Sequence, residues 1–374
     1  MENPCISVII PSYNHASYIG QAIESVLSQS FKSFELLIAD DCSTDNSIEI
    51  IKKFSDSRIR TFFLERNLGA VPILDFLINE AKGDYIALLN SDDFWYPSKL
   101  EKQYEIMQKK PDLGASFTWA NIVDENGRVL SNTDVPYAEV FIQRNKSQGE
   151  WLNHFFYNSN CLCHPSILIK RTIFEEIGSY KHYLRQIPDF ELWIRLIKSY
   201  PIYIHEERLV AHRRHFVNGE NASADTLENA IRGGNEMYLV FDSFFNDMKE
   251  SIFIEGFSEL FRNKNAISHE DMLCEQAFLL KNNRLNKNVF EFIALKKLAD
   301  LLQNKKTREI LSVQFGFTHS DYFNMTSTKG IGYLDLSTKL DGLNLDKIIV
   351  FLKKNNKLYA FLKKKYINIK KNYK

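Results

Sequence analysis

The sequence predicts an α/β fold that is followed by a mainly helical region. Over the first 110 residues, short apolar runs alternate with segments whose apolar residues recur every three or four positions. From about Leu227 onward only the helical spacing persists, and no proline follows Pro201. Hydrophobic residues make up 44% of the 374 residues and charged residues 25%, which is typical of a globular protein and excludes a disordered or collagen-like chain.

Four apolar runs predict the strands of a parallel sheet, and helical patterns follow the first three of them. The predicted strands are residues 6–10, 34–39, 58–64 and 85–89, and the predicted helices are residues 18–27, 48–54 and 73–81. In open α/β sheets, ligands bind beyond the carboxyl ends of the strands. Those ends carry residues 11–14, Asp40-Asp41 and Asp92-Asp93. We therefore expect three strand ends to meet at one crevice.

The carboxylates at these strand ends have two interpretations. Asp92 and Asp93 directly follow a buried strand and suit a divalent cation such as Mg²⁺ or Mn²⁺. The alternative is an acidic turn before a helix that starts near Pro97. Asp41 is a candidate ligand contact, while nearby Asp45 suits the N-cap of the next helix, and both roles are compatible.

The cysteine content and the N-terminus predict a cytoplasmic protein. Five cysteines are few, odd in number and scattered, which argues against a disulfide framework. No apolar stretch approaches the roughly 20 residues of a membrane span, and residues 1–11 lack a signal-peptide pattern. Cys161, Cys163 and His164 lack the second ligand pair of a zinc site, so zinc is not predicted.

The formal net charge of zero combines an acidic body with a basic end. Residues 347–374 contain ten lysines and no acidic residue, and the rest of the chain carries a net charge of −10. Phe351, Leu358, Leu362 and Ile369 share a helical face among these lysines, which suits peripheral contact with an anionic membrane surface. A solvated, partly disordered tail is the alternative. The acidic body and the lack of a nucleic-acid motif exclude nucleic acid as the expected partner.

Four motifs that occur in one order resemble family 2 glycosyltransferases with the GT-A fold, of the type that builds bacterial cell-surface glycans. The motifs are residues 6–14, 22–31, 34–45 and 83–93. The resemblance covers about residues 5–223 and implies a GT-A domain over residues 1–225. Within it, residues 1–110 would bind the nucleotide-sugar and residues 111–225 the acceptor. Residues 226–346 are predicted as a helical C-terminal region and residues 347–374 as a basic amphipathic tail.

The resemblance implies a nucleotide-sugar-dependent hexosyltransferase, with UDP as the expected nucleotide. The nucleotide-binding positions that it implies are Pro11, Tyr13, Asn14, Asp41, Asn67, Ser91 and Asp92. It places Mn²⁺ or Mg²⁺ on Asp93 and His215 and brings Arg213 to the donor diphosphate. A fixed cation would stabilise the charge that develops on the departing diphosphate. A solvated basic loop is the alternative interpretation of residues 209–215.

Several positions depart from the family pattern. Many relatives carry an arginine that approaches the donor on the helix before the metal strand, and this chain has Asp75 in that segment. Arg66 or Asn67, on the preceding loop, is the candidate replacement. His212 stands where relatives have tyrosine, so the role of this position is open.

The resemblance also implies an inverting reaction with a carboxylate base, which takes the proton of the acceptor hydroxyl. Asp189 occupies this position in the segment 188–196, where Pro188 replaces a family acid. Glu191 is the second candidate for the base, and an N-cap is the structural alternative for Asp189.

The predicted function is therefore an inverting, metal-dependent glycosyltransferase. It would move a sugar from a UDP-sugar to a hydroxyl of a free or lipid-linked glycan, at the inner face of the plasma membrane. The product would be a cell-surface polysaccharide, lipooligosaccharide or lipid-linked oligosaccharide. A nucleotidyltransferase would need a glycine-rich loop near the first strand, where residues 5–20 contain only Gly20. A catalytically weak nucleotide- or glycan-binding scaffold with the same fold is the non-enzymatic alternative.

Overall fold

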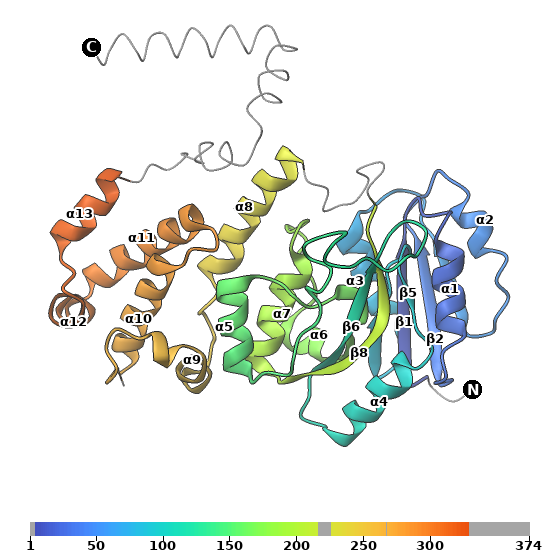
Figure 1. Ribbon diagram of the computed structural model, residues 1–374, viewed down its shortest axis with the longest axis horizontal. Helices are drawn as coiled ribbons and strands as arrows, with labels where there is room; N and C mark the ends of the chain where they lie inside the picture. The colour runs from blue at the N-terminus through green and yellow to red at the C-terminus, as the bar shows by residue number, and fades with distance from the viewer. Residues whose placement is uncertain (1–3, 216–225, 267, 329–374) are drawn as a thin grey trace, which may run out of the picture. The chain divides into compact units, whose positions relative to one another are not determined.

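The computed structural model describes residues 4–215, 226–266 and 268–328 (Figure 1). The chain divides into two compact units, of which the first ends at Ile293 and the second begins at Ala294. The predicted basic tail, residues 347–374, lies outside the described residues. The predicted change of domain between residues 225 and 226 stays a prediction.

A mixed sheet of eight strands forms the centre of the first unit (Figure 1). The strands are β1 (Ile6–Ser12), β2 (Phe34–Asp40), β3 (Ile59–Phe63), β4 (Tyr85–Leu88), β5 (Phe94–Trp95), β6 (Ala115–Val123), β7 (Leu168–Lys170) and β8 (Ile202–Arg213). Their order is β3-β2-β1-β4-β7-β6-β8-β5. The neighbours among β1 to β4 pair in parallel, so their carboxyl ends lie at one edge of the sheet. β7 is antiparallel to both β4 and β6, whereas β6 and β8 are parallel.

Helices connect the strands of this sheet. They are α1 (Ile19–Leu27), α2 (Ser47–Ile51), α3 (Ala70–Glu80), α4 (Lys99–Lys109), α5 (Gln148–Asn158), the 3₁₀ helix η1 (His164–Ser166), α6 (Thr172–Ile177) and α7 (Pro188–Ser199). The apolar residues of α1 recur at helical spacing, and Ile19, Ala22, Ile23 and Val26 are fully buried. The alternation of strands and helices confirms the predicted α/β fold class.

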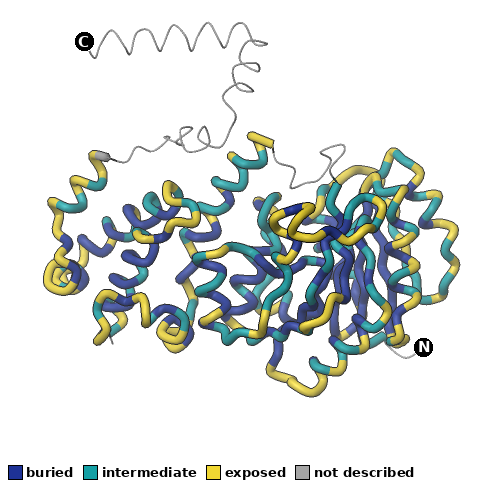
Figure 2. The backbone as a smooth tube through the Cα atoms, viewed as in Figure 1, coloured by how far each residue is buried: buried dark blue, intermediate teal, exposed yellow. Residues whose placement is uncertain are grey.

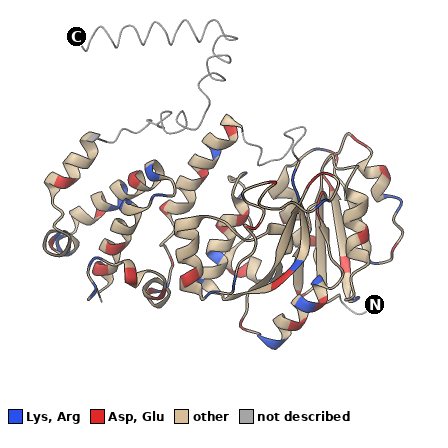
Figure 3. Ribbon diagram, in the orientation of Figure 1, with Lys and Arg blue, Asp and Glu red and all other residues tan. Residues whose placement is uncertain are grey.

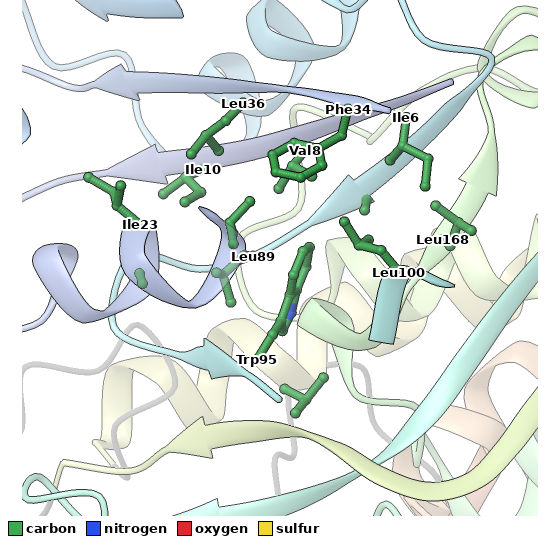
Figure 4. Close-up of a cluster of buried hydrophobic side chains, with 14 of the residues drawn as sticks. Ile6, Val8, Ile10, Ile23, Phe34, Leu36, Leu89, Trp95, Leu100 and Leu168 are labelled. Carbon is green, nitrogen blue, oxygen red and sulfur yellow. The ribbon is translucent and has the colours of Figure 1, made fainter. Parts of the chain in front are cut away.

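The core packs around β1, β2 and α1 (Figure 4). Ile6, Val8 and Ile10 from β1 lie among side chains of β2, α1 and α4, and the ring of Trp95 fills the space beside Leu100 (Figure 4). Figure 2 shows that these central strands are buried. Burial on both faces explains why the sequence has continuous apolar runs here rather than strict alternation.

The C-terminal part of the described chain is helical, as the sequence predicts. Its elements are α8 (Leu227–Asp242), α9 (Glu250–Phe257), the 3₁₀ helix η2 (Ser258–Leu260), α10 (His269–Asn282), α11 (Lys287–Gln303), α12 (Lys305–Phe315) and α13 (His319–Thr328). Figure 3 shows that basic and acidic residues are interspersed along these helices. Within the described segments, no helix has the length and apolar character needed to cross a lipid bilayer.

Helices α8 to α10 and the start of α11 belong to the same compact unit as the sheet, and α5 joins them to it. The ring of Phe156 on α5 lies 5.2–6.1 Å from five other rings, measured between centroids. These rings belong to Phe241, Phe244, Phe245, Phe257 and Phe290. The backbones of α5 and α9 are also in close contact. A Cβ added to Gly256 on α9 would lie only 2.4 Å from the carbonyl oxygen of Gly149 on α5, so glycine is needed here. Helices α8 and α9 and the start of α11 are therefore packed against α5.

A half-buried histidine makes the stability of the fold sensitive to acid. His205 on β8 packs against Tyr203, and its Nε2 has no hydrogen-bond partner among the described residues. Burial lowers the pKa of His205 to about 4. In an unfolded chain the pKa of histidine is about 6.5, so in that interval the unfolded state binds the extra proton. The free energy of unfolding therefore falls as the pH drops from about 6.5 to 4.

Replacing His205 with phenylalanine should remove this sensitivity while keeping a ring in the same place. The change should reduce the slope of the free energy of unfolding against pH, on the acid side, by up to about 1.4 kcal/mol per pH unit. This value is the maximum for one titrating group. Urea unfolding of both proteins, measured between about pH 7.5 and 4.5, tests this expectation. Parallel profiles for the two proteins would contradict it.

Candidate active site

The loops that follow β1 and β2 interlock at the carboxyl edge of the sheet. Asn14 has a positive φ of 52°, and its backbone N–H donates to Ser43 Oγ at 2.8 Å. Asn14 Oδ1 in turn accepts the backbone N–H of Thr44 at 2.8 Å. Tyr13 is 45% exposed beside this junction, while Pro11 is half-buried within β1. An exposed aromatic ring over an ordered loop suits stacking against a planar base.

Asp41 holds the segment that leads into α3. Its side chain is buried, and its two oxygens accept the backbone N–H groups of Leu68 at 2.7 Å and Gly69 at 2.8 Å. Its own N–H donates to the carbonyl of Ser12 at 2.8 Å. Asn67 is exposed on the same segment. The fold thus brings the predicted nucleotide residues from three loops to one edge of the sheet.

A carboxylate and two imidazoles converge at this edge. Asp92 Oδ2 lies 3.0 Å from His215 Nε2, and one ligand atom from each of His15, Asp92 and His215 lies within 4.8 Å of the others. His15 Nδ1 lies 2.7 Å from the hydroxyl of buried Ser91. One oxygen and two nitrogen donors suit Mn²⁺ better than Mg²⁺, which prefers oxygen ligands. Sequence reasoning missed His15, although it lies two residues after Tyr13 beyond the end of β1.

The charges in this cluster stabilise one another. The hydrogen bond with Asp92 raises the pKa of His215 above its ordinary value. Burial alone would raise the pKa of Asp92, but the hydrogen bond from His215 and the neighbouring histidines outweigh burial and lower it. Asp92 is therefore held as a carboxylate, the form that binds a cation.

Asp93 faces the interior, unlike its neighbour Asp92. It is 1% exposed, and its Oδ1 accepts the backbone N–H of Arg213 at 2.6 Å. Its Oδ2 accepts a hydrogen bond from Asn90 at 2.9 Å and lies 3.1 Å from His212 Nδ1. Asp93 thus fastens the loop after β4 to the end of β8, and the assignment of Asp93 as a metal ligand stays a prediction.

Arg213 is a buried cation whose guanidinium donates to other groups of the protein. Its Nε donates to the carbonyl of Asp92 at 2.7 Å, and Nη2 donates to Gln21 Oε1 at 2.8 Å. Its Nη1 donates to the carbonyls of Asp124 at 3.1 Å and Glu125 at 2.6 Å. The guanidinium therefore joins the loops after β4 and β6 to α1. Its predicted contact with the diphosphate stays a prediction.

The predicted base lies at the start of α7. Asp189 is half-buried, and its Oδ2 accepts a hydrogen bond from Asn160 Nδ2 at 2.9 Å. Asn160 is itself fixed, because its Oδ1 accepts the backbone N–H of Leu162 at 3.1 Å. Glu191, the second candidate, is instead paired with Arg195 through two hydrogen bonds of 2.7 Å. Sequence reasoning missed Asn160, which no motif singles out.

His164 links the two predicted halves of the site electrostatically. Its Nε2 lies 2.7 Å from the hydroxyl of Tyr180. Burial lowers the pKa of His164, and the negative charges of Asp189 and Asp93 oppose that change. Asp189 and Asp93 therefore both lie close enough to the same imidazole to influence it.

Asp75, in the segment where relatives carry an arginine, contacts the loop between α6 and α7. Its carboxylate is hydrogen-bonded to Ser179 and His182 on that loop. Helix α3 is thus tied to the loop that precedes Asp189.

The fold and the carboxylates at its strand ends define an α/β enzyme of the GT-A type, and comparison with known proteins gives its family. The model described as glycosyl transferase family 2 matches residues 7–178. An uncharacterised glycosyltransferase of Methanocaldococcus jannaschii is 32% identical over 218 residues, or 57% of this chain and 72% of that protein. The chain belongs to glycosyl transferase family 2 and is a glycosyltransferase.

Two further proteins extend this comparison. TuaG of Bacillus subtilis, a provisionally assigned teichuronic acid biosynthesis glycosyltransferase, is 41% identical over 129 residues, or 34% of this chain and 51% of TuaG. The crystal structure of S. aureus TarS residues 1–349 in complex with UDP-GlcNAc has a TM-score of 0.54 and 17% identity. That match covers 86% of this chain and 89% of the other, and it confirms the predicted GT-A fold.

Replacing Arg213 with glutamine should destabilise the whole protein rather than only weaken ligand binding. The change leaves three partly buried carbonyls without these donors, so the free energy of unfolding should fall by about 2–4 kcal/mol. Urea unfolding measures this loss. The exposed Arg66, changed to glutamine, is the control and should stay within about 0.5 kcal/mol of the wild type. Equal stability of the two variants would contradict the bracing role of Arg213.

Proposed function

We propose that this protein is an inverting, metal-dependent glycosyltransferase that moves a sugar from a nucleotide-sugar to a hydroxyl of a glycan. The observation that carries the proposal is the convergence of Asp92, His215 and His15 at the strand edge beside exposed Tyr13. Asp189 lies on the acceptor side and acts on the same His164 as Asp93. In this proposal the donor site and the base lie at the same edge of the sheet.

The cation site is the centre of the proposed donor site. Asp92 and His215, with His15, would hold Mn²⁺ or Mg²⁺, and Asp93 would brace the loop or contribute a ligand. When bound, the cation neutralises the charge that develops on the departing nucleoside diphosphate. Tyr13 would stack on the base, and Asn14, Asp41 and Asn67 would border the nucleoside.

The proposed transfer needs one proton acceptor. The acceptor hydroxyl attacks the anomeric carbon, the new C–O bond forms on the face opposite the leaving group, and the bond to the diphosphate oxygen breaks with its electron pair. Asp189 takes the hydroxyl proton. Asn160 holds Asp189 Oδ2, which leaves Oδ1 as the proposed proton acceptor. The ion pair of Glu191 with Arg195 favours Asp189 over Glu191 in this role.

The relatives suggest which substrates to test first. TarS shares the fold and binds UDP-GlcNAc in its crystal, so UDP-sugars are our first candidates for the donor. The name of TuaG refers to teichuronic acid, and we accordingly propose a cell-surface polysaccharide, or its lipid-linked precursor, as the acceptor. We place the reaction in the cytoplasm, where the sequence predicts the chain to remain.

Nucleotide binding should depend on the cation and on the cluster around Asp92. Calorimetric titration with UDP, in Mn²⁺ and then in chelator, should show binding that weakens at least about tenfold without the metal. Asp92→Asn and His215→Gln should each abolish this metal dependence, because each removes a donor atom. Asp84→Asn, an exposed carboxylate before β4, is the control. Equal UDP binding with Mn²⁺ and with chelator in the wild type would contradict the metal site.

Asp189→Asn should separate chemistry from donor binding. The variant keeps the shape of the side chain but cannot accept the proton, so transfer should fall by about 10²- to 10⁴-fold. Affinity for the donor should stay unchanged, as measured by the same titration. Full transfer by the variant would remove Asp189 as the base. A wild type that binds donors and transfers none of their sugars would instead favour the scaffold alternative.

A further inference from the structure

We propose that Glu236, on α8, is a positioning residue for Asp189, so that the helical region takes part in catalysis. The inference rests on the proposed function, in which Asp189 is the base. Glu236 is 3% exposed and lies beyond residues 7–178, where the family model matches. It would act through the backbone that precedes α7 and would not touch the substrate.

The start of α7 has no cap of its own. Ile187 is the N-cap residue and supplies no side-chain hydrogen bond, and Pro188 in the first helical position has no N–H. Helix starts leave several backbone N–H groups without intrahelical partners, and a side-chain acceptor normally satisfies some of them. In this helix the acceptor has to come from elsewhere in the fold.

Glu236 supplies acceptors for the N-cap residue, Ile187, and for the two residues before it. Its Oε1 accepts the N–H of Arg185 at 2.9 Å, and its Oε2 accepts the N–H groups of Gln186 at 2.7 Å and Ile187 at 3.1 Å. The side chain of Gln186 also donates to Asn229 Oδ1, on the same helix α8, at 3.1 Å. The segment is thus fixed to α8 up to the residue before Pro188.

A negative charge on Glu236 is favourable near the start of α7. A buried carboxylate is stable where several hydrogen bonds compensate its lost hydration, and hydrogen bonds to a charged acceptor are stronger than neutral ones. The N-terminus of a helix carries a partial positive charge that favours an anion nearby. Because Asp189 follows Ile187 by two residues, the three bonds fix the backbone that carries the proposed base.

The other end of the same loop is fixed independently. Arg195 donates to the carbonyls of Gly178 and Ser179, both at 2.8 Å, and Asp75 is hydrogen-bonded to Ser179. Loss of Glu236 would therefore loosen the segment next to Asp189 while the distant end stays attached. A shift of about 1 Å in a reacting group is enough to reduce a rate about 100-fold.

Glu275 offers a matched control on α10. It is 1% exposed, and its two oxygens accept the backbone N–H groups of Arg262 at 3.0 Å and Asn263 at 2.7 Å. Glu236→Gln and Glu275→Gln each remove a buried carboxylate that holds a backbone segment. Both should lower the unfolding midpoint, but only Glu236→Gln should lower kcat, by about 10- to 100-fold, with donor affinity unchanged. Equal kcat values for the two variants would overturn the proposal.

A double-mutant cycle tests whether Glu236 acts through Asp189. If it does, Glu236→Gln should reduce kcat in the wild type and have little further effect on the residual rate of Asp189→Asn. Multiplicative losses would overturn the proposal. Unchanged transfer in Asp189→Asn alone would instead show that the assignment of the base has failed. Should Glu236→Gln not fold, Glu236→Asp keeps the charge on a shorter side chain and should lower kcat without weakening donor binding; a normal kcat would overturn the proposal.

Discussion

The attachment of the loop after β4 to the end of β8 is the constraint on which the site depends. Asp93 accepts the backbone N–H of Arg213, and the Arg213 guanidinium donates to the carbonyl of Asp92 in return. This reciprocal pair of bonds joins two segments more than a hundred residues apart. It sets Asp92 opposite His215, two residues beyond Arg213, so the geometry of the cluster of Asp92, His15 and His215 follows from contacts that are themselves buried.

Much of the fold follows from local pattern. The buried parallel strands β1, β2 and β4 are continuous apolar runs, and the residues after them were predicted to share an edge because parallel strands end on the same side. The strands in the middle of the chain could not be predicted from local pattern. β6 and β8 pair in parallel across about 90 residues, and their register shifts near Trp119. Such non-local pairing leaves no periodic signature in either segment.

Only the site residues that lie in recognisable sequence motifs were predicted. The pair Asp92-Asp93 was found from its place after a strand, but adjacent residues of a turn point in different directions, and spacing alone does not tell which carboxylate faces the crevice. His15, Asn160 and Glu236 were missed because each is defined by its partner in the folded chain. A side chain that accepts backbone N–H groups, as Glu236 does, can bond to any residue except proline. The residue types of its partners therefore give no signal in the sequence.

The aromatic contacts of Phe156 have a consequence for the chain during its synthesis on the ribosome. Phe156 emerges early, whereas its partners Phe241, Phe257 and Phe290 follow up to more than a hundred residues later. At typical rates of synthesis this interval lasts on the order of ten seconds. Every strand of the sheet has been synthesised before Phe241, yet until the later helices follow, the face of α5 that packs against them is uncovered. The nascent protein therefore passes through a stage in which chaperones have an aromatic surface to shield.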